Sequence, residues 1–203
     1  MSFHTIIFDL GNVLIGWNPR NLYNKVFATP EEADWFVSNI VTLDWNEEQD
    51  KGRLAAEATE SLVAEYPKWE AEIRMYYDRF HEHFSGPIQG SVEILKALEA
   101  SGDYRLLALT NWSAEYFPWA RENFSFLDIF EHITVSGEIK MKKPEPRIYE
   151  HIRQAYDLDD FSGCLFIDDS ERNVVAARAA GLESIRFVGA EALREELTAR
   201  GIL

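Results

Sequence analysis

Short apolar runs alternate with longer amphipathic segments along most of this chain. The runs lie at 4–9, 105–109, 132–135, 164–167 and 184–188. Apolar runs of this length are typical of strands that are buried on both faces of a parallel sheet. Helical periodicity marks the segments between the later runs, at 90–101, 114–122, 146–156, 171–180 and 190–200. This alternation predicts an α/β, Rossmann-like fold with a parallel five-stranded sheet.

A long stretch between the first two predicted strands has a different character. Residues 18–85, called the helical block below, are predicted to be helical throughout. Thr29 precedes Pro30 and lies three residues before Glu32, which is the pattern of a capping box with proline at the first helical position. Amphipathic helices are also expected over 43–51 and 54–66.

The position of this block predicts two domains. The core domain would comprise residues 1–17 and 86–203, and the helical block of 18–85 would be an all-helical insertion near the carboxyl end of the first strand. The joining segments, Ile15-Gly16-Trp17 and Ser85-Gly86-Pro87, each contain a glycine that can absorb a change in backbone conformation. We therefore expect the insertion to move on these two segments.

The composition narrows the range of partners. A net charge of −15 argues against binding to nucleic-acid backbones and to anionic membrane surfaces, which attract basic proteins. Cys164 is the single cysteine, so no intrachain disulfide is possible and a reducing compartment is expected. The first apolar run is too short to span a membrane and lacks the features of a signal peptide. We therefore expect a cytoplasmic protein, and an anionic substrate would need a local positive charge.

Polar residues follow three of the predicted strands. The first strand ends at Asp9, the second at Thr110 and Asn111, and the fourth at Asp168 and Asp169. If the strand order is the common 3-2-1-4-5, the first strand lies between the other two and the switch point falls beside it. The side chains would then converge in one crevice.

A lysine and a metal ion would complete such a crevice. Lys143 lies in the connection after the third strand, close enough to supply a cation. Crowded carboxylates repel one another, and this raises their pKa values unless a cation lies among them. Mg²⁺ suits a site made of carboxylates, a backbone carbonyl, water and a substrate phosphate. The set indicates phosphoryl chemistry.

Each of these residues also has a simpler interpretation. Thr110 and Asn111 could form an ordinary connection from strand to helix. Asp168 or Asp169 could cap the helix that follows, since aspartate is favoured near helix N-termini. Lys143 taken alone could be a solvated lysine of the cluster 140–143.

Four segments together resemble the haloacid dehalogenase (HAD) superfamily, in the branch whose helical cap is inserted after the first motif. Residues 9–13 (DLGNV), 109–111 (LTN), 142–144 (KKP) and 166–169 (FIDD) are similar to its four motifs, in the right order and on the right elements. The resemblance covers essentially the whole chain. The start Asp-Leu-Gly-Asn also resembles some cap-bearing sugar-phosphate phosphatases.

The resemblance implies specific roles for the strand-end residues. Asp9 would be the nucleophile that forms an aspartyl-phosphate, as carboxylates do in covalent catalysis. Lys143 would assist catalysis and, with Thr110 and Asn111 of the second motif, would bind the phosphoryl group of a small phosphorylated metabolite.

It also implies a magnesium site. Asp169 would ligate Mg²⁺ together with Asp9 and the main-chain carbonyl of Gly11. Asp168 and Asn173 would support this site, Asn173 from one helical turn beyond the fourth motif.

One residue departs from the family pattern. Phosphatases of this superfamily usually carry a second aspartate two residues after the nucleophile, as general acid and base, and here that position is Gly11. A leaving group would therefore depart without a proton from this position. The absence of that carboxyl predicts a preference for good leaving groups, such as the anomeric oxygen of a hexose 1-phosphate.

Three functions are open at this point. The first is a Mg²⁺-dependent phosphatase for small phosphomonoesters, the second is a metal-free 2-haloacid dehalogenase in which Asp9 attacks carbon, and the third is a catalytically weak member that binds a phospholigand or a partner protein. The pair Asp168-Asp169 disfavours the second function, because unneutralised carboxylates would repel a haloacid.

Three residues of the helical block have two possible roles. Trp45, Gln49 and Arg53 share helical spacing and could face a substrate, or they could belong to the packing of the block.

Overall fold

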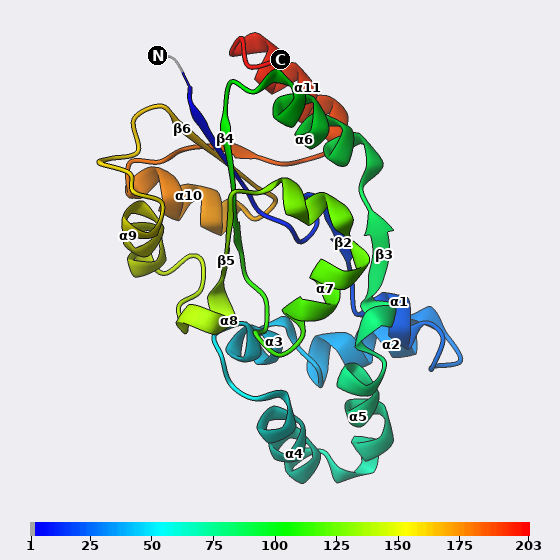
Figure 1. Ribbon diagram of the computed structural model, residues 1–203. Coiled ribbons are helices and arrows are strands. Elements are labelled where there is room, and N and C mark those ends of the chain that lie inside the picture. Colours follow the sequence, from blue (N-terminus) through cyan, green and yellow to red (C-terminus); the bar gives the residue numbers. More distant parts are fainter. Residues whose placement is uncertain (1–2) are drawn as a thin grey trace.

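The computed structural model describes residues 3–203 and contains a five-stranded parallel sheet (Figure 1). Its strands are β1 (Thr5–Phe8), β4 (Arg105–Thr110), β5 (His132–Val135), β6 (Cys164–Asp168) and β7 (Glu183–Arg186). They are hydrogen-bonded in the order β5-β4-β1-β6-β7, which is 3-2-1-4-5 when these strands are counted along the chain. The predicted fold class and strand order are confirmed.

The central strand β1 is buried on both faces. Thr5 is in register with Arg105 of β4 on one side and with Cys164 of β6 on the other. Ile6 and Phe8 pack into one apolar core, and Ile7 packs into a second core on the opposite face. A strand with two apolar faces lacks the alternation of polar residues, which is why β1 is a continuous apolar run in the sequence.

Helices cover both faces of the sheet (Figure 1). One core is completed by α6 (Gln89–Ser101), α7 (Phe117–Asn123) and α11 (Ala190–Ala199), with the short η3 (Ser125–Ile129). The other is completed by α9 (Pro146–Ala155) and α10 (Glu171–Ala179). The short α8 (Ser136–Ile139) follows β5 directly. Because these helices lie on the two faces of the sheet, they do not cover the residues that follow the carboxyl ends of the strands.

The helical block has its own apolar core. It contains α1 (Arg20–Tyr23), α2 (Pro30–Asn39), α3 (Leu43–Asp50), α4 (Ala55–Glu65), η1 (Pro67–Trp69), α5 (Glu70–Asp78) and η2 (Phe80–His83). Tyr23, Phe36 and Tyr76 are fully buried in this core. The predicted capping box of α2 is present, with 3.2 Å from the Glu32 main-chain nitrogen to Thr29 Oγ1. Figure 1 shows the block at one end of the sheet, where α3 contacts α8.

The two segments that join the block to the rest of the chain are paired with each other. β2 (Ile15–Trp17) and β3 (Phe84–Pro87) form an antiparallel ribbon, with Gly16 opposite Gly86. A Cβ atom at Gly16 would collide with the Ser85 hydroxyl, and Gly86 has a φ of +96° that favours glycine. The two joining segments therefore form one ribbon, and movement of the helical block on them stays a prediction.

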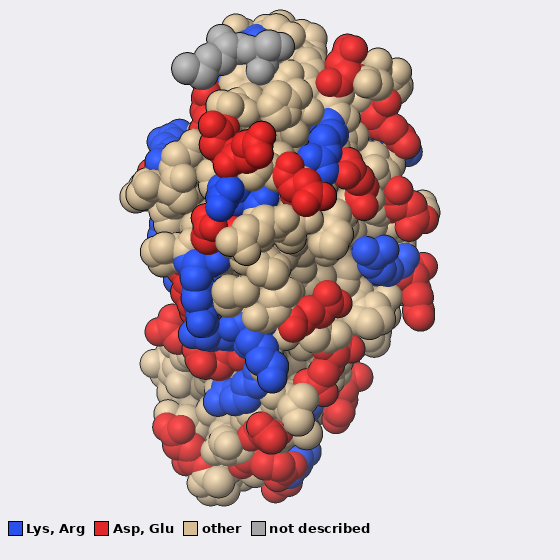
Figure 2. Space-filling view, turned by 60° about the vertical axis from the view of Figure 1, so that its left-hand side comes forward, with Lys and Arg blue, Asp and Glu red and all other residues tan. Residues whose placement is uncertain are grey.

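The outer surface carries mostly negative charge. On the face shown in Figure 2, acidic side chains surround a short run of basic ones, as expected for a net charge of −15. Within residues 3–203, no helix combines the length and the apolar character needed to cross a bilayer.

Candidate active site

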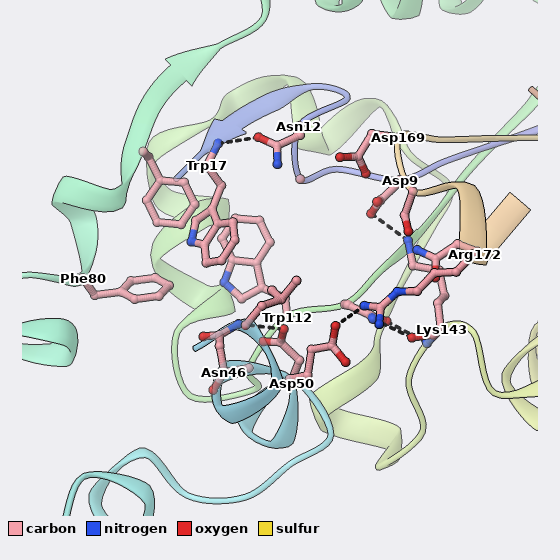
Figure 3. A pocket seen from close by; sticks show the side chains of 18 of the residues that line it. Asp9, Asn12, Trp17, Asn46, Asp50, Phe80, Trp112, Lys143, Asp169 and Arg172 are labelled. Carbon is pink, nitrogen blue, oxygen red and sulfur yellow. Dashed lines mark hydrogen bonds and ion pairs between the residues drawn. The ribbon is translucent and has the colours of Figure 1, made fainter. Parts of the chain in front are cut away.

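A cavity of about 350 Å³ lies between the helical block and the carboxyl ends of the strands (Figure 3). On the side of the sheet it is lined by Asp9, Gly11, Asn111, Lys143 and Asp169, together with Asn173. The topology therefore brings together most of the residues that the sequence singled out. This volume is at the low end of the range for small-molecule sites.

Asp9 lies directly after β1, with its side chain held from two sides. Its Oδ1 accepts a hydrogen bond from the Leu10 main-chain nitrogen at 2.8 Å and lies 2.9 Å from Lys143 Nζ. Burial raises the pKa of Asp9, Lys143 opposes this, and the nearby charge of Asp168 raises the pKa further. The Asp9 carboxylate is thus fixed at the cavity wall. The positive charge of Lys143 does not fully offset the burial and the negative charge that raise its pKa.

Lys143 is fully buried and has three partners. Its Nζ lies 2.7 Å from Asp168 Oδ2 and 2.9 Å from Asp9 Oδ1, and it donates to the Leu109 carbonyl at 2.9 Å. Burial alone would lower the pKa of Lys143, but the two carboxylates raise it above its ordinary value. Lys143 is therefore a fixed cation between two carboxylates. The solvated interpretation of this lysine is wrong.

Asn111 uses its side chain to hold the main chain of Lys143. Its Nδ2 donates to the Lys143 carbonyl at 2.9 Å, and its Oδ1 accepts from the Lys143 nitrogen at 2.8 Å. Both ends of the amide are thereby engaged with the loop. Asn111 positions Lys143, and direct binding of substrate by Asn111 stays a prediction.

The two aspartates after β6 have different surroundings. Asp168 is fully buried and accepts hydrogen bonds from Asn173 Nδ2 at 3.0 and 3.1 Å and from the Ser170 nitrogen at 2.8 Å. Asp169 instead lines the cavity. Asp168 is thus held behind the cavity wall, while Asp169 and Asn173 line the cavity, and the roles predicted for these three residues stay predictions.

These carboxylates form a group that fits a divalent cation. Asp9, Asp168 and Asp169 each offer an oxygen atom, and the three atoms lie within 4.8 Å of one another. Burial and the charge of Asp168 raise the pKa of Asp169. One lysine does not neutralise three carboxylates, and oxygen ligands of this kind suit Mg²⁺. Gly11 lines the same cavity.

Thr110 and Gly11, two further residues predicted for the site, lie in different places: only Gly11 lines the cavity. Thr110 is fully buried at the end of β4, and its hydroxyl has no hydrogen-bond partner within residues 3–203, although Thr110 is not part of the cavity lining. An unpartnered buried hydroxyl is uncommon and is compatible with a missing ligand. Gly11 lines the cavity, and apart from its two chain neighbours no heavy atom of residues 3–203 lies within 4 Å of the position that its Cβ would take. There is therefore open space directly beside Gly11.

Residues 3–181 match the haloacid dehalogenase-like hydrolase family. The chain belongs to this family. It is thus a HAD hydrolase, in agreement with the resemblance of its four motifs.

Two curated relatives of this HAD hydrolase match nearly along its whole length. Protein CbbY of Rhodobacter capsulatus is 28% identical over 197 residues, which cover 91% of this chain and 85% of that protein. The sesquiterpene phosphatase AstK of Aspergillus oryzae is 25% identical over 197 residues, which cover 97% of this chain and 95% of that protein.

Solved structures share the fold. A HAD family enzyme from Bacteroides thetaiotaomicron, crystallised as a magnesium complex, is 21% identical with a TM-score of 0.68, over 91% of this chain and 93% of that chain. The L-2-haloacid dehalogenase from Xanthobacter autotrophicus, with chloropropionic acid covalently bound, is 16% identical with a TM-score of 0.64, over 100% of this chain and 85% of that chain. At these identities the similarity shows only that this chain has the same fold as both of these enzymes.

The helical block supplies the opposite wall of the cavity in this HAD hydrolase. Helix α3 contributes Leu43, Asn46, Glu47 and Asp50 to the lining (Figure 3). Glu47 pairs with Lys142 at 2.9 Å and with Arg172, and both of these partners belong to the core. These ion pairs therefore hold the wall formed by α3 against the core.

Of the two interpretations given for Trp45, Gln49 and Arg53, the structure does not support the substrate-facing one. Trp45, Gln49 and Arg53 do not line the cavity. The guanidinium of Arg53 donates to Gln49 Oε1 at 2.9 and 2.7 Å and to the Trp45 carbonyl at 3.2 Å. The second interpretation, that these residues belong to the packing, is the one that the structure supports.

Sequence reasoning missed the polar residues that do line the cavity from α3. Asn46 and Asp50 lie four residues apart on a helix that is polar on more than one face. Buried polar positions on such a helix are a signal of a nearby site, because a helix that packs only on apolar residues shows an apolar stripe. Arg172, in the first turn of α10, was missed as well.

Aromatic side chains form the remaining part of the cavity wall. Trp17, Tyr77, Phe80, Phe84 and Trp112 all contribute to the lining. The rings of Phe84 and Trp112 stack with centroids 5.3 Å apart. The cavity therefore has a charged end for an anionic group and a less polar end for the rest of a substrate.

Proposed function

We propose that this HAD hydrolase is a Mg²⁺-dependent phosphatase that cleaves small phosphomonoesters through an aspartyl-phosphate on Asp9. The observation that carries the proposal is the convergence of Asp9, Lys143 and Asp169 at the charged end of one small cavity. A carboxylate nucleophile, a fixed cation and a metal-binding carboxylate are the groups that phosphoryl transfer to an aspartate requires.

Each residue has a definite part in the proposed reaction. Lys143, 2.9 Å from Asp9, holds the anionic phosphoryl group beside the nucleophile. The Asp9 carboxylate attacks phosphorus, the bond to the ester oxygen breaks, and the leaving oxygen takes up a proton. Water then cleaves the aspartyl-phosphate and releases inorganic phosphate. Asp9, Asp169 and the Gly11 carbonyl would hold Mg²⁺, which when bound neutralises negative charge on the phosphoryl group.

The substrate is proposed to be a small phosphorylated metabolite. A volume of about 350 Å³ accommodates a body the size of a monosaccharide beside the phosphate. A relative named as a sesquiterpene phosphatase supports release of phosphate as the reaction class. With Gly11 in place of a carboxyl, position 11 alone favours substrates with good leaving groups, such as the anomeric oxygen of a hexose 1-phosphate.

The two other functions remain as alternatives with weaker support. A haloacid dehalogenase would work without the metal, and Asp169 in the cavity wall would then repel its anionic substrate. A weak member that only binds a phospholigand would leave Asp9 unmodified. Beryllofluoride, which mimics a phosphoryl group on aspartate, should be trapped on Asp9 by the phosphatase and not by a protein that merely binds.

Removing Mg²⁺ should stop phosphate release. A screen of phosphorylated metabolites that includes glucose 1-phosphate should show activity with Mg²⁺, loss of activity with EDTA, and recovery when Mg²⁺ is added in excess. Asp169→Asn should raise the Mg²⁺ concentration for half-maximal activity by about tenfold or more. Asp128→Asn, which changes an exposed aspartate, is the matched control. Activity that survives EDTA would favour the dehalogenase.

The helical block is proposed to act as a cap that closes over the bound substrate. Its contacts with the core include the ion pairs of Glu47 with Lys142 and with Arg172, and the aromatic wall encloses the leaving group. Closure by such a cap excludes water and selects among leaving groups.

Weakening these contacts should raise KM. Glu47→Gln removes the charge that pairs with Lys142 and Arg172, and charge-assisted hydrogen bonds of this kind correspond to an effect on the order of tenfold in KM. Glu60→Gln is the matched control, because Glu60 is exposed and pairs with Arg74 inside the helical block. Equal kinetics for the wild type and Glu47→Gln would show that these pairs do not govern closure.

A further inference from the structure

The proposed reaction leaves the source of one proton unassigned. The leaving oxygen needs a proton donor, and position 11, which usually supplies it in this family, is a glycine with open space beside it. Attacking and leaving oxygens lie roughly in line on opposite sides of phosphorus. With Asp9 as the nucleophile, the leaving oxygen therefore points away from Asp9, toward the wall formed by the helical block.

Few groups on that wall can carry a transferable proton. Glu47 lines it, but although burial raises the pKa of this carboxyl, Arg172 and Lys142 lower it below its ordinary value, so it is ionised. Tyr77 also lines it, and burial raises the pKa of its hydroxyl well above the usual range. The carboxyl that remains on this wall is Asp50.

Asp50 is held in place by both parts of the molecule. It is partly exposed and lines the cavity, and Figure 3 shows it on the side opposite Asp9. Asn46 Nδ2 donates to Asp50 Oδ2 at 3.0 Å, and Tyr76 in turn donates to Asn46 Oδ1 at 2.7 Å. The hydroxyl of Ser136, in the core, donates to the main-chain carbonyl of Asp50. This end of α3 is thus anchored to the core.

We propose that Asp50 is the proton donor for the leaving group, an inference that rests on the proposed function. As the bond between phosphorus and the ester oxygen breaks, the electron pair left on that oxygen takes the proton of Asp50, and Asp50 becomes a carboxylate. The water that cleaves the aspartyl-phosphate must approach along the same line. It gives its proton to Asp50 as its oxygen bonds to phosphorus, which restores the acid.

The surroundings of Asp50 suit this cycle. Burial, with a further contribution from the charge of Glu47, raises the pKa of Asp50 to about 7, so both protonation states are populated near neutral pH. A catalytic acid and base works best when its pKa is close to the working pH. The charged and titratable groups that influence its pKa are Glu47 of α3, Tyr76 and Tyr77 of α5, and Lys142 and Lys143 of the loop between α8 and α9.

The proposal changes the expectation that follows from Gly11. With a donor at Asp50, the wild type should cleave ordinary alkyl phosphates as well as esters with good leaving groups. The strong preference for good leaving groups should instead appear when Asp50 loses its proton.

The test is the dependence of kcat/KM on the leaving group, because kcat/KM reports the step in which that group departs. The probes are p-nitrophenyl phosphate, phenyl phosphate and glucose 6-phosphate, in order of increasingly poor leaving groups. Asp50→Asn should lose about 10²–10⁴-fold on glucose 6-phosphate, less on phenyl phosphate and least on the nitrophenyl ester. In the wild type, kcat/KM for glucose 6-phosphate should fall as the pH rises through about 7, and this decline should be absent in the variant.

Asp44→Asn, an exposed change on the same helix, is the control and should behave as wild type on all three esters. An equal loss on all three esters for Asp50→Asn would show that Asp50 only positions other groups, and unchanged ratios would show that another donor acts. Either result overturns the assignment of Asp50 while phosphate release by the wild type still supports the proposed function. Absence of phosphate release from any ester by the wild type would overturn both.

Discussion

Asp9→Asn is expected to abolish phosphate release, with a loss on the order of 10⁴-fold or more, the scale on which loss of a catalytic nucleophile acts. The amide keeps the shape of the side chain but cannot attack phosphorus. Burial raises the pKa of Asp9, so a neutral amide is at least as well accommodated in the folded protein. The melting temperature in EDTA should therefore not fall. The measurements are phosphate release and thermal unfolding of the purified variant.

The matched control for this experiment is Asp103→Asn, which changes an exposed aspartate. It should keep both activity and melting temperature. Near-wild-type turnover by Asp9→Asn would rule out a covalent intermediate on this residue. A large drop in melting temperature would instead show that Asp9 is needed for folding, and beryllofluoride trapping on the wild type would then decide its chemical role.

Lys143→Met is expected to damage both stability and activity. The substitution leaves Asp9 and Asp168 buried without the cation that lies 2.9 and 2.7 Å from them. Removing one partner of a buried ion pair typically costs about 3–5 kcal/mol. For a chain of this size, that corresponds to a melting temperature lower by about 6–20 °C. Phosphate release should fall by roughly 100-fold or more, because the phosphoryl group also loses its fixed positive charge.

Lys96→Met is the control for this substitution, since Lys96 is exposed on α6. Its effect on the free energy of unfolding should stay within about 0.5 kcal/mol. Adding Mg²⁺ should recover part of the stability of Lys143→Met but not of the control, because a cation then compensates for the missing charge. A variant at position 143 as stable as the control would contradict the role of this buried pair.

The sequence was most informative where a signal is local. The three central strands β1, β4 and β6 are mostly apolar runs, and the residues that end or follow such a run are set by chain order, so Asp9, Thr110 and Asp169 could be located from the sequence alone. Strand order followed from a common topology. The capping box at Thr29 and Glu32 was found because all of its groups lie within four residues.

The remaining features depend on contacts between distant residues. The pairing of Ile15 with Pro87 joins two short segments that contain glycine and proline, and neither segment resembles a strand by itself. The side of α3 that faces the cavity could not be chosen, because a polar helix has no apolar stripe to orient it. Asp50 was overlooked for this reason. Its raised pKa arises from burial and from Glu47, and burial is a property of the folded chain that the sequence does not display.

The central position of β1 has a consequence for the order of folding. This strand comes first in the chain, but its two hydrogen-bonded neighbours begin only at Arg105 and Cys164. The strand that leads to Asp9 therefore cannot complete its pairing on the ribosome until most of the polypeptide has emerged. The helical block is continuous in sequence, and local contacts form faster than distant ones. We expect the helical block to collapse early during synthesis, while the sheet and the proposed active site assemble last.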